Sequence, residues 1–219
     1  REIGRWPREL SSRISFLDIG GGYWPPGGEW LLPEATDGGR IRQLLAGGTP
    51  DRSAHILNPA IGIEEAASCL AKAIRREIFP TTQCRLCFEP GRWLSNEAMH
   101  IMISVVDRKE TDLVITDAGT NAIGWERFEQ DYAPVLNLSR PALTEKQCHV
   151  LGSLCTPHDV WGYGYFGTGI DRGDVLLIPD QGAYTYSLRQ HFIKPLPTVV
   201  RMCCSPPFSP VSGSRQTPS

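Results

Sequence analysis

The order of predicted elements in the N-terminal half restricts the fold of this chain more than any other feature. A short apolar run over residues 14–19 ends at three consecutive glycines, which predicts a buried strand followed by a permissive loop. Apolar residues at helical spacing predict a helix over residues 63–78, which Pro80 ends. A second short strand is predicted over residues 84–88. A strand, a helix and a strand in this order are typical of a βα unit with parallel strands.

The pattern changes near residue 97. Beyond this point, β-rich stretches separated by turn residues cover residues 101–106, 113–116, 175–178 and 198–202. We therefore predict an α/β part over residues 1–97, followed by a mostly antiparallel β domain over residues 98–204.

Two segments show no apolar period. Residues 24–60 are rich in Pro and Gly and predict a long irregular connection. Residues 205–219 are rich in Ser and Pro and predict a disordered tail. The chain has 219 residues in total, which is long enough to bury a core without disulfides or metals.

Charge and cysteine usage exclude several classes of function. The 22 Lys and Arg residues against 24 Asp and Glu give a net charge of −2, which argues against a dedicated surface for nucleic acid or membrane. No apolar run approaches the ~18 residues of a transmembrane helix. The seven cysteines are odd in number and irregularly spaced, without a secretion signal, and predict reduced thiols in a cytoplasmic protein. Cys84 and Cys87 lack a second pair of ligands, so no metal site is expected.

Two predicted loops carry residue types suited to an anion site. Gly20, Gly21 and Gly22 follow a strand directly, and glycine allows the positive φ that turns amide N–H groups toward a phosphate. A tight turn is the alternative there. Glu89 and Arg92 follow the second strand, at the end where parallel α/β folds build their sites. An ordinary turn with a solvated ion pair is the alternative for this loop.

Two positions in the predicted β domain also carry reactive or hydrogen-bonding groups. Tyr184 follows a glycine-containing turn, where its hydroxyl can donate to a phosphate, although a buried structural tyrosine is as common. Cys155 lies in a loop with His158 and Asp159 and can act as a reactive thiol, although most cysteines are inert buried residues. The residues alone leave both alternatives open.

Taken in order, these segments resemble one family. The segments that carry the resemblance are LDIGGGY, FEPGRWL, TDAG, GSLCTPHD, GDVL and GAYT, which lie within residues 16–200. They are similar to the pyridoxal-phosphate-dependent decarboxylases of the ornithine/diaminopimelate/arginine group, which have the alanine-racemase-like fold type III. The resemblance implies a pyridoxal 5'-phosphate cofactor, a small amino-acid substrate and a homodimer with active sites shared across its interface.

The resemblance also implies the architecture. In this family a cofactor-binding (β/α)8 barrel is combined with a β domain. Residues 1–97 are then expected to form a C-terminal segment of the barrel, and residues 98–204 the β domain, with the chain returning to the barrel near the end of that range. The fold class is thus α/β plus β.

The cofactor roles that the resemblance implies fall on both glycine-containing loops. Gly20, Gly21 and Gly22 would hold the cofactor phosphate, and Tyr184 would donate a hydrogen bond to it. Glu89 would pair with the pyridine nitrogen and keep the ring protonated, so that the ring accepts the electrons left when CO2 departs.

The remaining implied roles concern the rest of the cofactor site and the substrate. Gly91 and Arg92 would complete the cofactor site, with Arg92 in contact with phosphate or substrate, and Tyr184 would also lie at the substrate. Cys155 would enter the neighbouring subunit's site and help protonate the quinonoid carbon after α-decarboxylation. Asp159 would lie near the substrate.

The sequence departs from the family pattern in its substrate loop. Thr156 stands where the family carries an acid that grips the distal amine of a basic amino acid, which argues against an ornithine or lysine substrate. Residues 124–128 and 161–165 are more similar to siderophore-pathway relatives that decarboxylate citrate–amino-acid conjugates.

A second departure concerns the Schiff-base lysine of the family. None of the four lysines stands in the family's lysine motif; they are Lys72, Lys109, Lys146 and Lys194. We therefore expect this chain alone to be inactive and interpret it as the C-terminal part of a decarboxylase, whether a gene fragment, a truncated product or a split subunit.

Two other functions compete with a carboxy-lyase. A non-catalytic homologue that dimerises with an active enzyme and regulates it would have no physical need to keep the glycine loop, Glu89 and Cys155 together. A racemase of the same fold type would place an arginine rather than Glu89 at the ring nitrogen. We therefore favour the decarboxylase.

Overall fold

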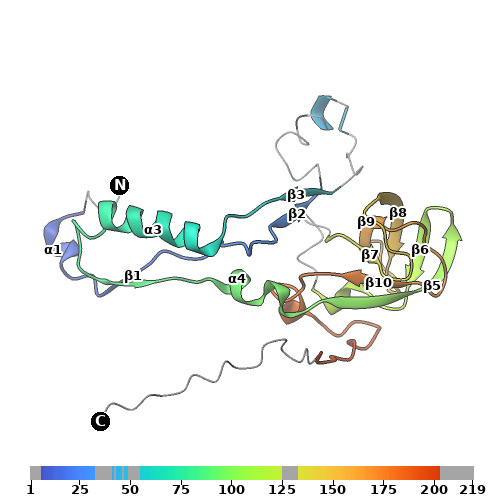
Figure 1. Cartoon of the computed structure of the whole chain (residues 1–219). Coiled ribbons are helices and arrows are strands. Elements are labelled where there is room, and N and C mark those ends of the chain that lie inside the picture. The colour runs from blue at the N-terminus through green and yellow to red at the C-terminus, as the bar shows by residue number, and fades with distance from the viewer. Residues whose placement is uncertain are drawn as a thin grey trace, which may run out of the picture.

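A computed structural model describes residues 6–32, 41, 43–45, 47–48, 55–124 and 133–202. Its elements are α1 (Arg8–Ser11), β1 (Phe16–Asp18), β2 (Glu29–Leu31), β3 (Ile56–Asn58), α3 (Ile63–Glu77), β4 (Arg85–Cys87), α4 (Gly91–Ser95), η3 (Asn96–Ala98), β5 (Ile101–Glu110), β6 (Leu113–Thr116), η4 (Thr120–Ala122), β7 (Leu136–Asn137), β8 (Glu145–Leu151), β9 (Val160–Phe166), β10 (Val175–Ile178) and η6 (Tyr186–Leu188). Figure 1 shows α3 and β1 at one end of an elongated chain, the strands β5 to β10 at the other end, and β2 and β3 between them.

The N-terminal part contains the expected parallel unit. Strands β1 and β4 pair in parallel, with Phe16 opposite Arg85 and Asp18 opposite Cys87. Helix α3 lies between these strands in the chain. It has acidic residues in its first turn and basic residues in its last turn, and both interact favourably with the helix dipole. The helix ends where the N–H of Ile78 bonds the carbonyl of Ile74.

A short hairpin interrupts the segment that the sequence predicts to be irregular. Strands β2 and β3 pair antiparallel, with Glu29 opposite Asn58, so the prediction for residues 24–60 is wrong where these strands lie. Each strand has only three residues, too few to leave an alternating pattern. Gly28 permits the close approach, since a Cβ there would lie 2.4 Å from the carbonyl oxygen of Asn58.

A buried acid–base pair fixes this hairpin to the C-terminal strands. The backbone N–H of His55 donates to Glu145 Oε2 at 2.7 Å, and its Nδ1 lies 2.6 Å from Oε1. The two side chains are 1% and 11% exposed. Burial alone would raise the pKa of the Glu145 carboxyl, but the hydrogen bonds from His55 outweigh it and hold that pKa below its ordinary value. Trp30 packs edge-on against Phe166 in the same contact, with ring centroids 5.8 Å apart.

The C-terminal part is a six-stranded closed barrel in the order β10-β5-β6-β8-β9-β7. Within the described residues, the β6–β8 and β7–β9 pairs are parallel and the other pairs antiparallel, which confirms the mostly antiparallel β domain. Alternate residues of β5 point inward, and Ile101, Ile103 and Val105 are buried there. Each such side chain contributes about 1.5–3 kcal/mol of burial free energy.

Several strand predictions need correction. Strands β6 and β10 coincide with their predicted ranges, and β5 extends the predicted stretch to Glu110. Residues 198–202 form no strand, and Met202 there is 83% exposed. Strands β8 and β9 were not predicted. In β9, Gly162 and Gly164 obscure the strand pattern; a Cβ at Gly164 would lie 2.8 Å from a Glu145 carboxylate oxygen, so the glycine allows β8 to approach.

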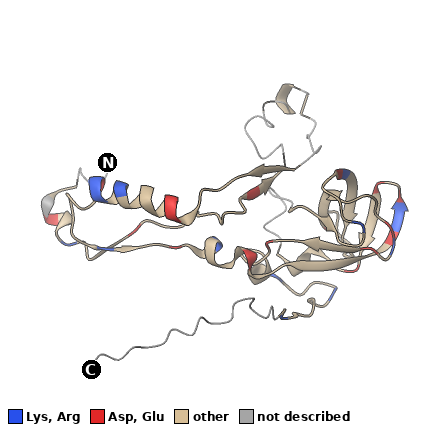
Figure 2. Cartoon of the chain, in the orientation of Figure 1, with Lys and Arg blue, Asp and Glu red and all other residues tan. Residues whose placement is uncertain are grey.

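Figure 2 shows acidic residues at the start of α3 and basic residues toward its end, and residues of both charges at the end of β5. In the part of the chain that the structure describes, no helix is long and apolar enough to cross a membrane. Nor does this part hold a group of three or more His, Cys, Asp or Glu side chains placed to bind a metal ion. The predicted tail and residues 125–128 lie outside the described residues.

Candidate functional site

The glycine loop and the loop after β4 form one structural unit. The N–H of Ile19 donates to the carbonyl of Cys87 at 3.1 Å, and the N–H of Glu89 donates to the carbonyl of Gly20 at 2.9 Å. These bonds continue the β1–β4 pairing beyond both strands. The two loops that the sequence separates by helix α3 therefore lie side by side at the carboxyl ends of parallel strands.

At each position of the loop, the structure favours glycine over a residue with a side chain. Gly20 and Gly22 have φ values of +75° and +83°, which glycine adopts without steric cost. Gly21 has no left-handed φ, but there is no room for a side chain at this position, since a Cβ would lie 2.3 Å from the carbonyl oxygen of Glu89. The N–H of Gly20 donates to Asp18 Oδ1 at 2.9 Å, so the N–H groups of Gly21 and Gly22 are the candidates for binding an anion.

Helix α4 begins at Gly91, two residues after Glu89. The N–H of Gly91 donates to the carbonyl of Glu89 at 2.8 Å, and Pro90 occupies the N-cap. This tight turn leaves the Glu89 side chain exposed. The carboxylate is thus available at the surface of the loop pair.

Arg92 is held between two aromatic rings. Its guanidinium carbon lies 4.1 Å from the centroid of Trp24 and 5.2 Å from that of Tyr184. Its Nη1 also donates to Asn96 Oδ1 at 3.3 Å. The guanidinium keeps its positive charge, and stacking on aromatic faces fixes its orientation. The positive charge is therefore positioned beside the loop that begins at Gly20.

Tyr184 reaches this place through a turn packed on α4 and η3. The N–H of Gly182 donates to the carbonyl of Asn96 at 3.0 Å, and a Cβ at Gly182 would lie only 1.6 Å from the carbonyl oxygen of Ser95. Tyr184 has a φ of +56° and is 60% exposed. Its hydroxyl approaches the start of α4, since a Cβ at Gly91 would lie 3.3 Å from it. A left-handed φ on a bulky residue is uncommon, and such strain concentrates at functional sites.

The structure thus brings together most of the candidate residues predicted from the sequence. We call this group the glycine-loop cluster; its members are Gly20, Gly21, Gly22, Glu89, Gly91, Arg92 and Tyr184.

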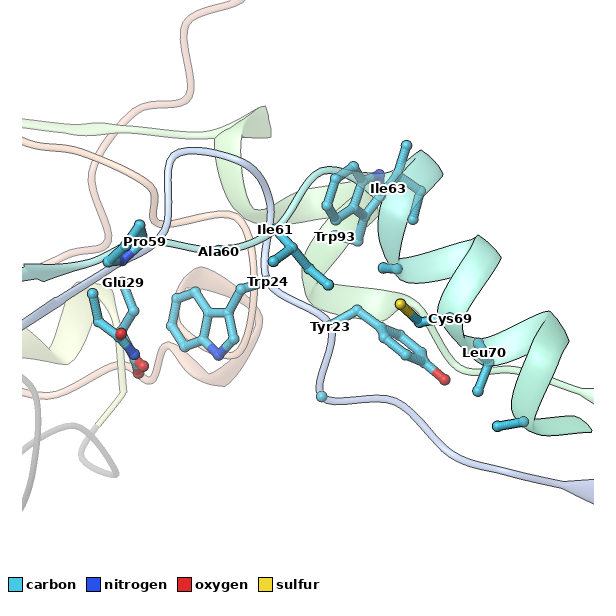
Figure 3. Close-up of a pocket in the computed structure, with 14 residues that line it drawn as sticks. Tyr23, Trp24, Glu29, Pro59, Ala60, Ile61, Ile63, Cys69, Leu70 and Trp93 are labelled. Carbon is cyan, nitrogen blue, oxygen red and sulfur yellow. The ribbon is translucent and has the colours of Figure 1, made fainter. Parts of the chain in front are cut away.

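A cavity of about 540 Å3 opens beside this cluster, at Gly22. Figure 3 shows Tyr23, Trp24 and Trp93 around it, with the apolar side of α3 opposite. Its volume falls in the range of small-molecule sites, and its walls are largely aromatic and aliphatic. Trp24 is not among the residues predicted from the sequence, although an aromatic residue two positions after the glycines was a usable signal.

Cys155 lies apart from the cluster, in the loop between β8 and β9. Its side chain is exposed, and its loop contacts residues 117–120 of the same domain. Asp159, at the end of this loop, is 3% exposed and accepts hydrogen bonds from protein groups. The contacts therefore place Cys155 in the β barrel rather than at the glycine loop.

Cys148 and three of the lysines have local partners or surroundings of their own. Burial raises the pKa of the Cys148 thiol to about 11, so this cysteine is unreactive. Lys72 is exposed on α3, Lys109 pairs with Asp107, and Lys146 donates to the carbonyl of Thr168.

Comparison with known proteins gives a consistent picture. The family described as "Pyridoxal-dependent decarboxylase, C-terminal sheet domain" matches residues 28–182. The diaminopimelate decarboxylase of Methanothermobacter thermautotrophicus is 31% identical over 120 residues, which cover 52% of this chain and 28% of that protein. The diaminopimelate decarboxylase of Methanocaldococcus jannaschii is 32% identical over 111 residues, covering 49% of this chain and 25% of that protein.

Solved structures show the same fold. A crystal structure of the M. jannaschii diaminopimelate decarboxylase with L-lysine aligns with a TM-score of 0.58 at 23% identity, covering 83% of this chain and 36% of that one. The lysine decarboxylase of Selenomonas ruminantium aligns with a TM-score of 0.53 at 20% identity, covering 83% and 40%. The chain therefore spans between a quarter and two fifths of the length of these relatives.

Proposed function

Because this chain belongs to the pyridoxal-dependent decarboxylase family, whose C-terminal sheet domain it carries, we propose that it contributes to an enzyme that removes the α-carboxylate of an amino acid. Strands β1 and β4 with α3 are then part of the cofactor-binding (β/α)8 barrel. The six-stranded barrel is the sheet domain. The observation that carries the proposal is the junction of the glycine loop with Glu89, Arg92 and Tyr184.

The residues of the glycine-loop cluster fit pyridoxal 5'-phosphate. The left-handed φ values of Gly20 and Gly22, together with a Gly21 that has no room for a Cβ, favour a loop whose Gly21 and Gly22 amides can donate to an anion. Arg92 adds a fixed positive charge, and Tyr184 adds a hydroxyl donor. When bound, the pyridoxal ring supplies the electron sink that decarboxylation requires.

Each side chain of the cluster then has a defined task. The amides of Gly21 and Gly22 bind the phosphate together with Arg92, and the Tyr184 hydroxyl donates to one of its oxygens. The exposed Glu89 carboxylate holds a proton on the ring nitrogen, because a negative charge beside the nitrogen favours its protonated form. Gly91 leaves the approach to Tyr184 open. The amine that anchors the cofactor comes from outside the four lysines of this chain, so the chain by itself is inactive.

The position of Cys155 supports a shared active site. Its thiol is exposed in a loop of the β barrel, away from the contacts of the glycine-loop cluster, so we propose that it serves the site of a second copy in a homodimer. There it donates the proton that replaces the departing carboxylate.

The substrate proposed is an amino acid or amino-acid conjugate whose distal end is not an amine. Thr156 in the Cys155 loop offers a hydroxyl that accepts from the N–H of His158 at 3.4 Å, and a hydroxyl provides no charge to hold an ammonium group. Conjugates of the kind used by siderophore-pathway relatives meet this condition, in a cytoplasmic enzyme.

Substitution of Glu89 tests the function. In the cofactor-loaded enzyme, we expect Glu89→Gln to retain pyridoxal phosphate and to lower kcat for CO2 release about 100-fold or more, because a neutral amide does not favour the protonated ring. Glu97→Gln, at a nearby exposed carboxylate on η3, is the matched control and should leave kcat unchanged.

Equal kcat values for the two variants would remove Glu89 from its assigned role. If the chain, combined with the lysine-bearing part of the barrel, releases no CO2 from any α-amino acid and yet associates with an active decarboxylase, that result would favour the regulatory alternative.

A further inference from the structure

We infer that Asp159 is a positioning residue whose buried carboxylate holds the loop that presents Cys155. It acts through this loop rather than by touching substrate. The contacts of the carboxylate, the space around it and the second anchor of the loop all support this role. The effect on catalysis rests on the proposed function, whereas the effect on the loop does not.

Both oxygens of Asp159 are engaged by protein donors. Oδ2 accepts the backbone N–H of Leu154, the residue before Cys155, at 2.6 Å. Oδ1 accepts the backbone N–H of Thr120 at 2.7 Å and its hydroxyl at 3.0 Å. The residue is 3% exposed. Hydrogen bonds to a charged acceptor in a buried site are among the stronger ones, so this carboxylate is committed to the loop.

The backbone of Asp159 closes the same loop. Its N–H donates to the carbonyl of Thr156 at 3.2 Å, and its carbonyl accepts the N–H of Gly152 at 2.8 Å. Gly152 also leaves the space that the carboxylate fills, since a Cβ there would lie 2.2 Å from both carboxylate oxygens. Position 152 therefore requires glycine for a steric reason, because the Asp159 carboxylate occupies the space that a Cβ would need.

The segment after β6 provides the second anchor. Besides Thr120, Gly119 packs against Leu154, where a Cβ would lie 2.3 Å from the leucine Cγ. The hydroxyl of Ser153 donates to the carbonyl of Asp117 at 3.2 Å. Residues on both sides of the Leu154 peptide are thus fixed, and the next residue in the chain is Cys155.

Through these contacts, Asp159 determines the position of the Cys155 thiol. A proton donor must be held within about an ångström of its productive position, and small displacements cost large factors in rate. A side chain that binds substrate would instead need an oxygen facing solvent or ligand. In Asp159 the three donors already occupy both oxygens, so a loss of this carboxylate should affect kcat rather than KM.

Hydrogen exchange of the full chain tests the positioning role without cofactor or substrate. Asp159→Asn keeps the shape, but its single carbonyl oxygen replaces only one of the two acceptors. We expect the Leu154 amide to exchange about 10–100-fold faster than in the wild type, as the loss of a charge-assisted hydrogen bond predicts. Asp174→Asn is the matched control, because Asp174 is a buried carboxylate of the same barrel that accepts from Asn137 and Asp171. It should leave the Leu154 amide unchanged.

Gly152→Ala provides a second perturbation that leaves the charge intact and displaces the carboxylate by steric conflict. In the cofactor-loaded enzyme, we expect Asp159→Asn and Gly152→Ala to lower kcat about tenfold or more with an unchanged KM. Exchange at Leu154 that matches the wild type in both variants, or a raised KM with an unchanged kcat, would overturn the inference. Absence of CO2 release when the chain is combined with the lysine-bearing part of the barrel would refute the proposed function alone, because the exchange measurement still decides the role of Asp159.

Discussion

Gly21→Ala tests the junction on which the site depends. The backbone of Gly21 is free of left-handed strain, so this substitution adds only a methyl group. That methyl would lie 2.3 Å from the carbonyl oxygen of Glu89, about an ångström inside ordinary contact distance. The two loops must therefore separate, which also breaks the 2.9 Å hydrogen bond between the Glu89 N–H and the Gly20 carbonyl.

The expected cost follows from these two effects. Overpacking of this kind costs about 1–3 kcal/mol, and the lost hydrogen bond about 1 kcal/mol more. In a chain of this length each kcal/mol lowers Tm by about 2–4 °C. We also expect pyridoxal phosphate to bind about tenfold more weakly, which corresponds to about 1.4 kcal/mol. Thermal unfolding followed by circular dichroism and a fluorescence titration with pyridoxal phosphate measure the two effects.

Gly27→Ala is the matched control for this experiment. A Cβ at Gly27 would meet only a Glu97 carboxylate oxygen at 3.7 Å, which is ordinary contact. We expect Tm to shift by no more than a surface substitution causes, about 0.5 kcal/mol in free energy, with an unchanged affinity for the cofactor. A Gly21→Ala protein with the Tm and cofactor affinity of the Gly27→Ala control would refute the close contact between the loops.

Three further outcomes follow from other contacts. The lowered pKa of Glu145 stabilises the fold above the ordinary pKa, and this contribution is lost as the pH falls through the lowered folded-state pKa, so the Tm difference between wild type and Glu145→Gln should be largest at neutral pH and vanish in acid. Iodoacetamide at pH 8 should label the exposed Cys155 and spare Cys148, whose pKa is about 11; equal labelling in mass spectra would contradict the burial. If Cys155 serves the partner's site, mixing Cys155→Ala with an enzyme that lacks its Schiff-base lysine should restore about a quarter of wild-type activity by random exchange. A dead mixture would place the thiol in the site of its own subunit.

Local patterns were sufficient to predict several elements. Helix α3 has an apolar face, charged residues matched to its dipole and a proline beyond its end, all within one short stretch. Strands β6 and β10 are compact runs of β-branched and aliphatic residues, and both occur where the sequence predicts them. For these elements the information lies within the segment itself, so the prediction does not depend on long-range contacts.

Long-range contacts decided the features that the sequence missed. The hairpin β2–β3 is held by Gly28 against Asn58 and by His55 against Glu145, and both contacts join residues far apart in the chain. Residues 198–202 resemble a strand in composition but pair with no strand in the described part of the chain. The role of Trp24 depends on the guanidinium of Arg92, which no local pattern connects to it.

The candidate site was predicted in part. The glycine loop, Glu89 and Tyr184 stood out because glycine turns at strand ends are visible in sequence. Their meeting was not predictable from spacing, since it requires the parallel β1–β4 pairing and the packing of Gly182 on Ser95. The burial of Asp159 was not predictable from the sequence either, because its hydrogen-bond donors, Thr120 and Leu154, precede and follow β8 in the chain.

A titration of the isotope-labelled chain with pyridoxal 5'-phosphate, followed by amide NMR, tests the central claim most directly. Pyridoxal without its phosphate is the matched ligand. We expect saturable shifts of the Gly21, Gly22 and Arg92 amides with the phosphate ester, little response to pyridoxal, and unchanged signals in β8 and β9. Equal responses to both ligands, or shifts confined to the β barrel, would contradict a phosphate site at the glycine loop.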